Sequence, residues 1–191
     1  YFQGLPFYAR TRVVVVAGRA GIGKSSLLAE SQRAARAGGF SALTARASDL
    51  EREFAFGVAR QLFERAVRRS PQWWAGAADQ ARAVFDEVPA APGGIFEDVS
   101  QSVLHGLYWL VVNASADGPL LLTVDDLQLC DRSSLRFLSY LSRRLDGLPV
   151  VVVAGYRTAG QPPADAALDE LVGDPATQLV QPQPLTLEAV T

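Results

Sequence analysis

The stretch that decides the fold is Val13-Val14-Val15-Val16-Ala17, followed at once by Gly18-Arg19-Ala20-Gly21-Ile22-Gly23-Lys24-Ser25. The first five residues form a β-branched apolar run, which is typical of a strand buried on both faces. Good helix formers fill residues 24–37, and the pair Gly38-Gly39 ends that pattern. The sequence therefore predicts a strand, a glycine-rich loop and a helix in direct succession.

The glycine-rich loop fits the pattern G-x-x-x-x-G-K-[ST], the P-loop, between the strand and the helix that this motif requires. Glycines let the main chain wrap a polyphosphate, and the N–H groups at the positive helix end point toward it. Lys24, the only lysine in the chain, would reach the β- and γ-phosphates, and the hydroxyl of Ser25 would ligate Mg²⁺. A glycine-rich turn without a ligand is the alternative interpretation.

Apolar runs alternate with helical segments along the rest of the chain, and the strands are uniformly apolar. This pattern predicts an α/β fold with a central parallel sheet covered by helices on both faces. Further strands are expected at residues 40–45, 120–124, 150–154 and 178–180. Helices are expected at residues 48–69, opened by a capping box Ser48-x-x-Glu51, at 96–113 and 133–145, and in short pieces around 73–74 and 79–88.

Acidic and basic side chains follow two of these strands, where parallel sheets bind their ligands. Asp125 and Asp126 come directly after the strand at 120–124, and would face a metal-bridged phosphate if that strand lies beside the first. Asp125 is then the candidate for holding Mg²⁺ and Asp126 for orienting or deprotonating the attacking water. Their alternative is a plain helix cap or turn. Arg157, after the strand at 150–154, is a candidate γ-phosphate sensor, with a solvated loop arginine as the alternative.

Length, composition and charge exclude several classes of function. The 191 residues carry a net charge of -2, so no overall positive field exists to hold nucleic acid or an anionic membrane. A single Cys and a single His exclude an internal disulfide and a His-rich zinc site, and a reducing cytosol is the simplest compartment. The apolar runs are far shorter than the roughly 20 residues of a membrane helix. Residues 1–4 resemble the remnant of a cleaved expression tag, which leaves 5–191 as one domain.

The chain also resembles a known family in four stretches. These are residues 18–25, ARASDLEREFAFGVARQLF at 45–63, VLHGLYWLVVN at 103–113 and LLLTVDDLQLCDRSSLRFLSYLSRRL at 120–145. Together they resemble the ATPase domain of large ATP-binding regulators of the LuxR type, which belong to the signal-transduction ATPases with numerous domains. The resemblance covers nearly the whole chain from about Val13 onward. It implies a three-layer P-loop NTPase fold of the ASCE type.

The resemblance also implies ligands and partners. It implies ATP or ADP at residues Gly18 to Ser26, Mg²⁺ at Ser25 and Asp125, water activation at Asp126 and a sensor role for Arg157. In that family a downstream sensor region and a C-terminal helix-turn-helix read the nucleotide state. The segment Leu185 to Val190 looks like the beginning of a helical lid, so the chain is expected to be a core that stops before it.

The chain departs from the family at two places. The family commonly reads Asp-Asp-Leu-His-Trp-Ala-Asp where this chain reads Asp125-Asp126-Leu127-Gln128-Leu129-Cys130-Asp131. A Gly-Arg-Glu segment that usually lies near the adenine is missing from residues 5–12, so no adenine-contacting residue is assigned.

A nucleotide-binding regulatory module that hydrolyses ATP slowly is therefore the expected function. An aspartate at position 126 is one methylene shorter than the glutamate of many fast P-loop ATPases, which favours slow turnover. Two alternatives stay open: a P-loop kinase for a small molecule, and an assembly module that holds nucleotide without hydrolysis. Direct DNA binding by this domain is not expected, and a nucleotide-dependent oligomer stays open.

Overall fold

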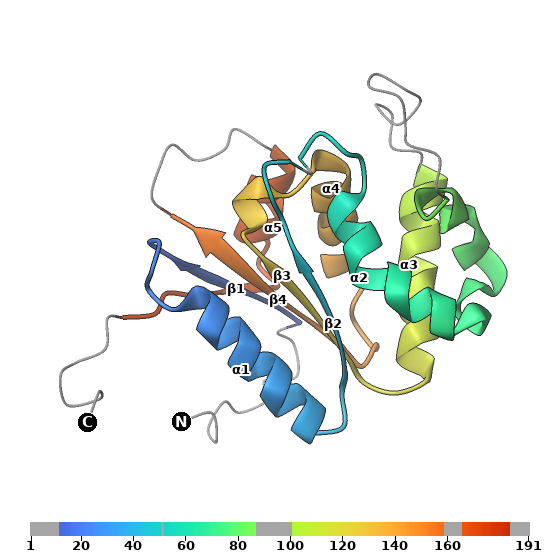
Figure 1. Cartoon of the computed structure of the whole chain (residues 1–191), viewed down its shortest axis with the longest axis horizontal. Coiled ribbons are helices and arrows are strands. Elements are labelled where there is room, and N and C mark those ends of the chain that lie inside the picture. Colours follow the sequence, from blue (N-terminus) through green and yellow to red (C-terminus); the bar gives the residue numbers. More distant parts are fainter. Residues whose placement is uncertain (1–11, 51, 87–100, 159–165, 184–191) are drawn as a thin grey trace.

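The computed structural model describes residues 12–50, 52–86, 101–158 and 166–183, which form a parallel sheet and its covering helices (Figure 1). Within these residues the strand order is β2-β3-β4-β1-β5, and every neighbouring pair is parallel. The predicted α/β class and its parallel sheet are therefore confirmed. The strands are β1 (Val13–Gly18), β2 (Ser41–Arg46), β3 (Leu120–Asp125), β4 (Val150–Arg157) and β5 (Thr177–Val180).

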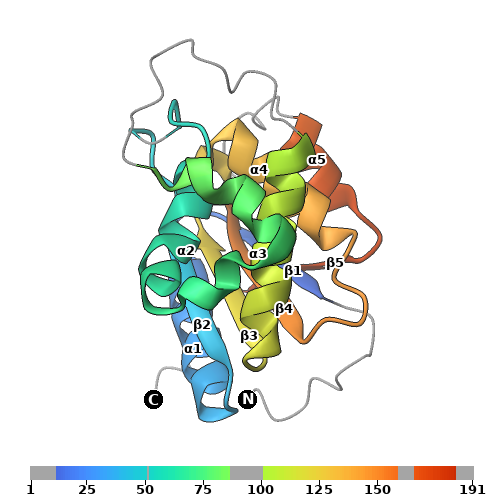
Figure 2. The same cartoon turned by 90° about the vertical axis from the view of Figure 1, so that its right-hand side faces the viewer.

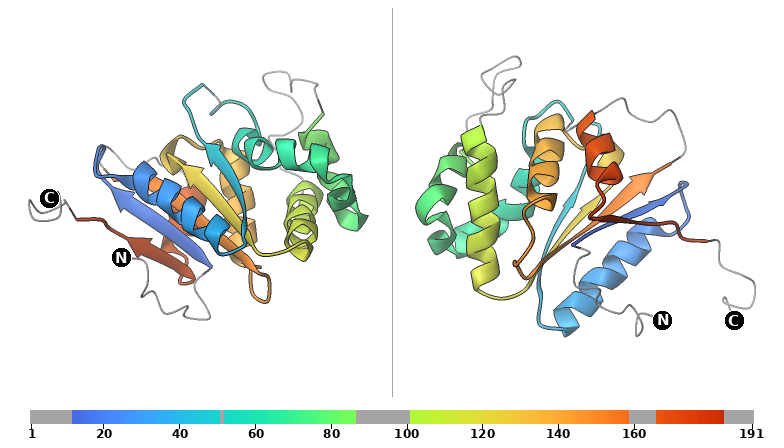
Figure 3. Two further views of the ribbon diagram at one scale, coloured as in Figure 1. Left: turned by 60° about the horizontal axis from the view of Figure 1, so that its bottom comes forward. Right: turned by 180° about the vertical axis from the view of Figure 1, so that it is seen from behind.

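Helices cover both faces of this sheet, as expected. In the left view of Figure 3, α1 lies in front of the strands and α4 behind them. Figure 2 shows α2, α3 and the two short helices between them in the chain beside one another, on the side that faces the viewer. The α-helices are α1 (Lys24–Ala37), α2 (Gly57–Arg69), α3 (Gln101–Ala116), α4 (Arg132–Ser142) and α5 (Ala166–Gly173), and the 3₁₀ helices are η1 (Pro71–Trp74), η2 (Gly76–Val84) and η3 (Leu127–Leu129).

The uniformly apolar strands supply two cores at once, because successive side chains of a strand point to opposite faces. On β3, Leu120 and Leu122 join the large core under α2 to α5, whereas Leu121 joins the small core under α1. Likewise on β4, Val152 faces the large core and Val153 the small one. Burial on both faces explains why these segments show no alternation of polar and apolar residues.

The carboxyl ends of β1, β3 and β4 meet at one edge of the sheet and bring the predicted site residues together. The sequence made the placement of Asp125 and Asp126 conditional on β3 lying beside β1, and this condition is not met, because β4 is inserted between them. A second difference concerns Arg157, which is the last residue of β4 and pairs in register with Gly18, instead of following the strand in a loop. Pairing with β1 extends β4 three residues beyond Ala154.

Helix boundaries agree with the sequence where the signals are local. The helix after the P-loop spans Lys24–Ala37 as expected. The next helix does not begin near Ser48 as expected, because α2 starts only at Gly57. Glu51, the other residue of the expected capping box, lies outside the described residues. The expected helix at 96–113 is described from Gln101 onward, and its predicted first residues also lie outside.

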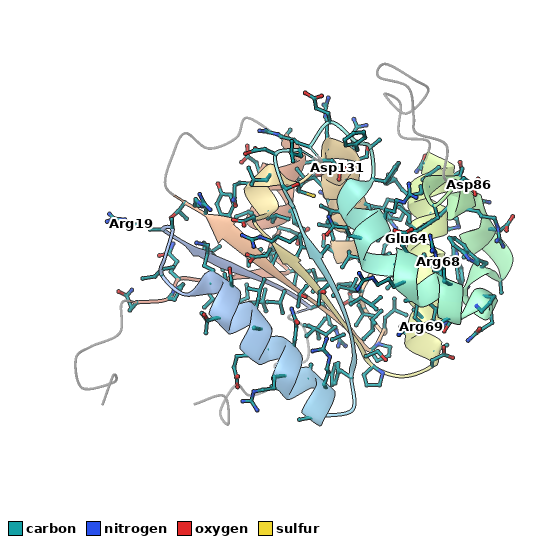
Figure 4. The ribbon with its side chains drawn as sticks, viewed as in Figure 1. Arg19, Glu64, Arg68, Arg69, Asp86 and Asp131 are labelled. Carbon is teal, nitrogen blue, oxygen red and sulfur yellow. The ribbon has the colours of Figure 1, made fainter. Side chains whose placement is uncertain are left out.

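The start of α2 is capped by residues that are distant in sequence. Asp131 accepts hydrogen bonds from the backbone N–H groups of Phe56 (2.8 Å) and Val58 (3.1 Å), and Ser134 Oγ accepts one from Ala59 (3.0 Å). The Asp131 carboxylate also caps α4 through the N–H of Ser134, and Figure 4 labels it at the start of that helix. Burial raises the pKa of Asp131, while these N–H donors act in the opposite direction. One carboxylate thus joins the starts of two helices.

We expect Asp131→Ala to lower the free energy of unfolding by about 3 kcal/mol, because it removes a helix cap and leaves buried N–H donors without an acceptor. Urea unfolding followed by circular dichroism measures this loss. Asp79→Ala is the matched control, since Asp79 is exposed and pairs with Arg82 on the same helical turn. The control should change stability by about 0.5 kcal/mol or less. Equal losses in the two variants would contradict the capping role.

Candidate functional site

The P-loop leaves the first turn of α1 open toward solvent. Gly21 and Gly23 have φ angles of 78° and 96°, in the left-handed region that glycine adopts without strain. Gly23 is the N-cap of α1 and no side chain caps this end. The first N–H groups of any helix have no partner within it. The loop therefore presents main-chain donors and the positive end of a helix to an anion.

Lys24 holds the loop together from the inside. Its ammonium group donates to the carbonyl oxygens of Gly18 (3.0 Å) and Arg19 (2.8 Å), and the residue is 7% exposed. A buried ammonium with two carbonyl partners places a positive charge under the loop, where a polyphosphate would lie. The structure thus puts Lys24 where the motif predicts it.

The P-loop is joined to the end of β3 by one short hydrogen bond. Ser25 Oγ donates to Asp125 Oδ2 at 2.6 Å, although the two residues are 100 positions apart. The other carboxylate oxygen of Asp125 accepts the N–H of Asp126 at 2.9 Å. Gly155 on β4 makes room for this carboxylate, because a Cβ at that position would lie 2.6 Å from Asp125 Oδ1. The two predicted metal ligands are therefore brought together.

The donor chemistry at this point fits Mg²⁺ bound with a polyphosphate. A hydroxyl and a carboxylate are hard oxygen donors, which Mg²⁺ prefers. No cluster of three or more His, Cys, Asp or Glu side chains that could hold a metal occurs among the described residues. Mg²⁺ usually keeps water and takes only one or two carboxylates together with substrate phosphates, so two side chains suffice here.

Asp126 occupies a constrained position behind Asp125. It has a φ of 55° and a ψ of 46°, a left-handed conformation that few residues other than glycine adopt and that Asp and Asn tolerate best. Its side chain is nearly buried and is surrounded by three polar groups. These are Gln128 Nε2 at 2.9 Å, Arg157 Nη2 at 3.4 Å and Arg46 Nη2 at 3.3 Å.

These neighbours set the ionisation state of Asp126. Burial alone raises the pKa of this carboxyl, but the hydrogen bonds from Gln128 and Arg46 and the positive charges of Arg157 and Arg46 outweigh it. The net result is a pKa below the usual range for aspartate. Asp126 is therefore ionised at neutral pH and is a weak base, which suits orienting a water better than deprotonating it.

Gln128 stands where the resembled family has histidine, and it links Asp126 to β4. Its Nε2 donates to Asp126 Oδ1, and its Oε1 accepts the backbone N–H of Arg157 at 2.9 Å. The amide thus fixes the acid and the strand end that carries the candidate sensor. The Arg157 side chain is 45% exposed, and its contact with Asp126 places it at the site.

The sequence reasoning missed three residues at this site: Arg46, Gln61 and Gly155. Arg46 ends β2 opposite Asp125 in the sheet register, and Gln61 on α2 binds the Arg46 backbone in both directions, at 3.0 and 3.2 Å. The rule that ligands bind beyond strand ends could have pointed to Arg46. The close approach of Gly155 depends on the order of the strands, which no local signal reveals.

The other predicted loop residues, Ala20, Ile22 and Ser26, lie on the loop or the first turn of α1. Arg19 is exposed and projects from the loop away from the body of the molecule (Figure 4). Their contacts with a nucleotide stay predictions.

Comparison with known proteins gives the family. Residues 6–153 match the family described as the AAA ATPase domain, and the chain belongs to it. The fold is the three-layer P-loop NTPase fold, with the strand order reported above. A search of curated proteins found no match.

Two solved structures are similar to this chain. The chain is similar to the Orc1 protein of Aeropyrum pernix, solved in complex with DNA, with 17% identity, coverage of 92% of this chain and a TM-score of 0.46. It is similar to Cdc6p of Pyrobaculum aerophilum with 17% identity, 93% coverage and a TM-score of 0.49. The chain spans 40% of the length of each of these proteins. Among the described residues, no helix is long and apolar enough to cross a membrane.

We expect the ionised Asp126 to stabilise the fold above about pH 4 and to lose this effect as the pH falls through its lowered folded-state pKa, because the unfolded chain takes up the proton first. Asp126→Asn keeps the left-handed backbone conformation and removes the charge. The stability advantage of the wild type over this variant should be about 1 kcal/mol or less near pH 7, since both arginines are partly exposed, and should vanish once the pH is below the lowered folded-state pKa. Urea unfolding over this pH range measures it. A difference independent of pH would contradict the assigned charge.

Proposed function

We propose that this domain is a nucleotide-controlled switch that binds ATP or ADP with Mg²⁺ and hydrolyses ATP slowly. The observation that carries the proposal is the Ser25–Asp125 hydrogen bond, which brings the P-loop and the acidic strand end together. The main-chain donors around Gly21 and Gly23 and the buried ammonium of Lys24 support a polyphosphate at the same place. Of the P-loop functions considered, this is the one that these contacts support best.

Each side chain has a defined part in this proposal. Bound Mg²⁺ would neutralise phosphate charge, with Ser25 and Asp125 as its protein ligands. Lys24 neutralises the β- and γ-phosphates from below the loop. Asp126 accepts a hydrogen bond from the attacking water and orients it. Arg157 stabilises negative charge on the terminal phosphate, from the strand end that Gln128 holds.

Slow hydrolysis follows from the contacts of Asp126. Its carboxylate is shared by Gln128, Arg46 and Arg157, so a water must compete with three existing donors.

The same contacts favour a second candidate function, an assembly module that binds nucleotide without hydrolysis. A phosphate-release assay separates the two: turnover that Asp126→Asn abolishes supports the switch, and no turnover in the wild type despite Mg-ATP binding supports the module.

The wider setting of the proposal comes from the resemblance to LuxR-type regulators. In that setting the domain is cytosolic and passes its nucleotide state to a downstream sensor region and a helix-turn-helix of the same protein. The domain itself is not proposed to bind DNA, and a gel shift with this chain tests that. A small-molecule kinase remains the rival enzyme, and release of ADP stimulated by nucleosides, sugars or short acids would favour it.

We expect Lys24→Ala to abolish binding of Mg-ATP and Mg-ADP, because it removes the positive charge under the loop. Calorimetric titration of wild type and variant with ATP, ADP and GTP, with and without Mg²⁺, measures this. Circular dichroism controls for folding, since the ammonium also binds the carbonyls of Gly18 and Arg19. Unchanged affinity in a folded variant would overturn the proposed function.

Gly155→Ala tests the metal end of the site separately. The added methyl group would displace the Asp125 carboxylate, so we expect Mg²⁺ to lose most of its enhancement of ATP affinity while metal-free binding changes little. Gly173→Ala is the matched control, since a Cβ there would meet no atom within 4 Å in the described residues, apart from its chain neighbours and its own helix. Titrations with and without Mg²⁺ on both variants give the comparison. An equal response of both variants to Mg²⁺ would contradict the role of Asp125.

A further inference from the structure

Arg46 is a cation at the site to which neither the P-loop motif nor the acidic pair assigns a role. It is the last residue of β2 and lies opposite Asp125 in the sheet register. Its guanidinium contacts Asp126 Oδ2 at 3.3 Å through Nη2 and at 3.4 Å through Nε. Charge-assisted hydrogen bonds of full strength are about 2.7–2.9 Å long, so this pair is loose.

The Arg46 side chain is free to exchange partners while its backbone is fixed. The side chain is 74% exposed, and an ion pair of this kind contributes little net stability. The backbone N–H and C=O, in contrast, are both bound by the side-chain amide of Gln61 on α2. The N–H of the next residue, Ala47, donates to the carbonyl of Asp125 at 3.0 Å. An exposed and weakly paired guanidinium therefore lies on a backbone segment that hydrogen bonds tie to α2 and to the end of β3.

Arg46 also lines a cavity that opens beside the proposed metal ligands. This cavity has a volume of about 350 Å³ and extends from the Ser25–Asp125 contact over β2 and β3. Of its lining residues, Arg46 carries the positive charge and Asp125 the negative one. The lining residues are Ser25, Leu28, Ala29, Gln32, Thr44, Ala45, Arg46, Gln61, Thr123 and Asp125.

We propose that Arg46 discriminates ATP from ADP by exchanging the Asp126 carboxylate for the terminal phosphate, and that Gln61 transmits this exchange to α2. This inference rests on the proposed function. A terminal phosphate offers more negative charge and more acceptor oxygens than one carboxylate, and a guanidinium binds it in a bidentate manner. ADP lacks that group, so with ADP Arg46 stays on Asp126.

When the Arg46 guanidinium leaves the Asp126 carboxylate, both the nucleotide site and helix α2 are affected. At the site, Asp126 loses one of its three donors and becomes available to a water. At α2, Gln61 is bonded to both backbone groups of Arg46, so any displacement of the end of β2 that accompanies the exchange would be passed to the helix. A ligand shifts a conformational equilibrium only through its different affinity for the two states, and the terminal phosphate supplies that difference here.

The first experiment compares ADP with a non-hydrolysable β,γ-imido analogue of ATP by calorimetric titration in the presence of Mg²⁺. We expect Arg46→Gln to weaken binding of the analogue about tenfold and to leave ADP within about twofold of the wild type. Arg33→Gln is the matched control, because the Arg33 side chain is also 74% exposed and pairs with Glu30 on the same helix. This control should change neither affinity.

The outcomes of this titration distinguish a failure of the Arg46 proposal from a failure of the proposed nucleotide switch. Equal weakening of both nucleotides by Arg46→Gln, or weakening of neither, overturns the discrimination by Arg46 and leaves the switch standing. A wild type that binds neither nucleotide overturns the proposed function itself. A wild type that binds both, with a selective loss in Arg46→Gln, supports the inference.

Hydrogen exchange tests the transmission through Gln61. In the wild type we expect the amides of α2 (Gly57–Arg69) to exchange at different rates with the analogue and with ADP. Gln61→Leu should retain the preference for the analogue in binding, because Gln61 is not proposed to touch the phosphate, but should abolish this difference in exchange. A difference that persists in Gln61→Leu would overturn the transmission step.

Discussion

The hydrogen bond from Ser25 to Asp125 is the contact on which the site depends, because it joins two segments that the chain separates by 100 residues. Its formation requires the sheet to be assembled, with β4 between β1 and β3. The glycine at 155 leaves room for this contact, because a Cβ there would lie 2.6 Å from Asp125 Oδ1. The local motif therefore meets the acidic end of β3 only through long-range packing.

Electrostatic balance at Asp126 is the second constraint, and it shapes the rest of the site. A nearly buried carboxylate without partners would be costly, and Gln128, Arg46 and Arg157 supply its donors. The two arginines come from β2 and β4, on either side of β3. Both are partly exposed, so each contributes little to stability and is free to bind a ligand anion instead. The arrangement keeps the acid ionised and the two positive charges available.

The sequence predicts the site in those parts where the signal is local. The β1 strand, the P-loop and α1 follow from apolar residues, glycines and helix formers that are adjacent in the chain, and Asp125 and Asp126 follow from their place at a strand end. Arg46 and Gly155 could not be singled out with equal force, because their roles depend on which strands are neighbours. The local pattern predicts the start of α2 too early, because the helix begins at Gly57, where Asp131, 75 positions after Phe56, binds its first N–H groups.

That distant cap connects α2 to the site a second time. Asp131 lies five residues beyond Asp126, after the short η3 helix, and binds the N–H groups of Phe56 and Val58. Gln61, about one helical turn further along α2, binds Arg46. The helix α2 is thus bound by Asp131, which follows β3, and by Arg46, which ends β2. Asp126 is linked to the first residue through the chain and to the second through the ion pair with Arg46. A change of partner at Asp126 would therefore reach α2 through Arg46 and Gln61, next to a helix start that Asp131 holds in place.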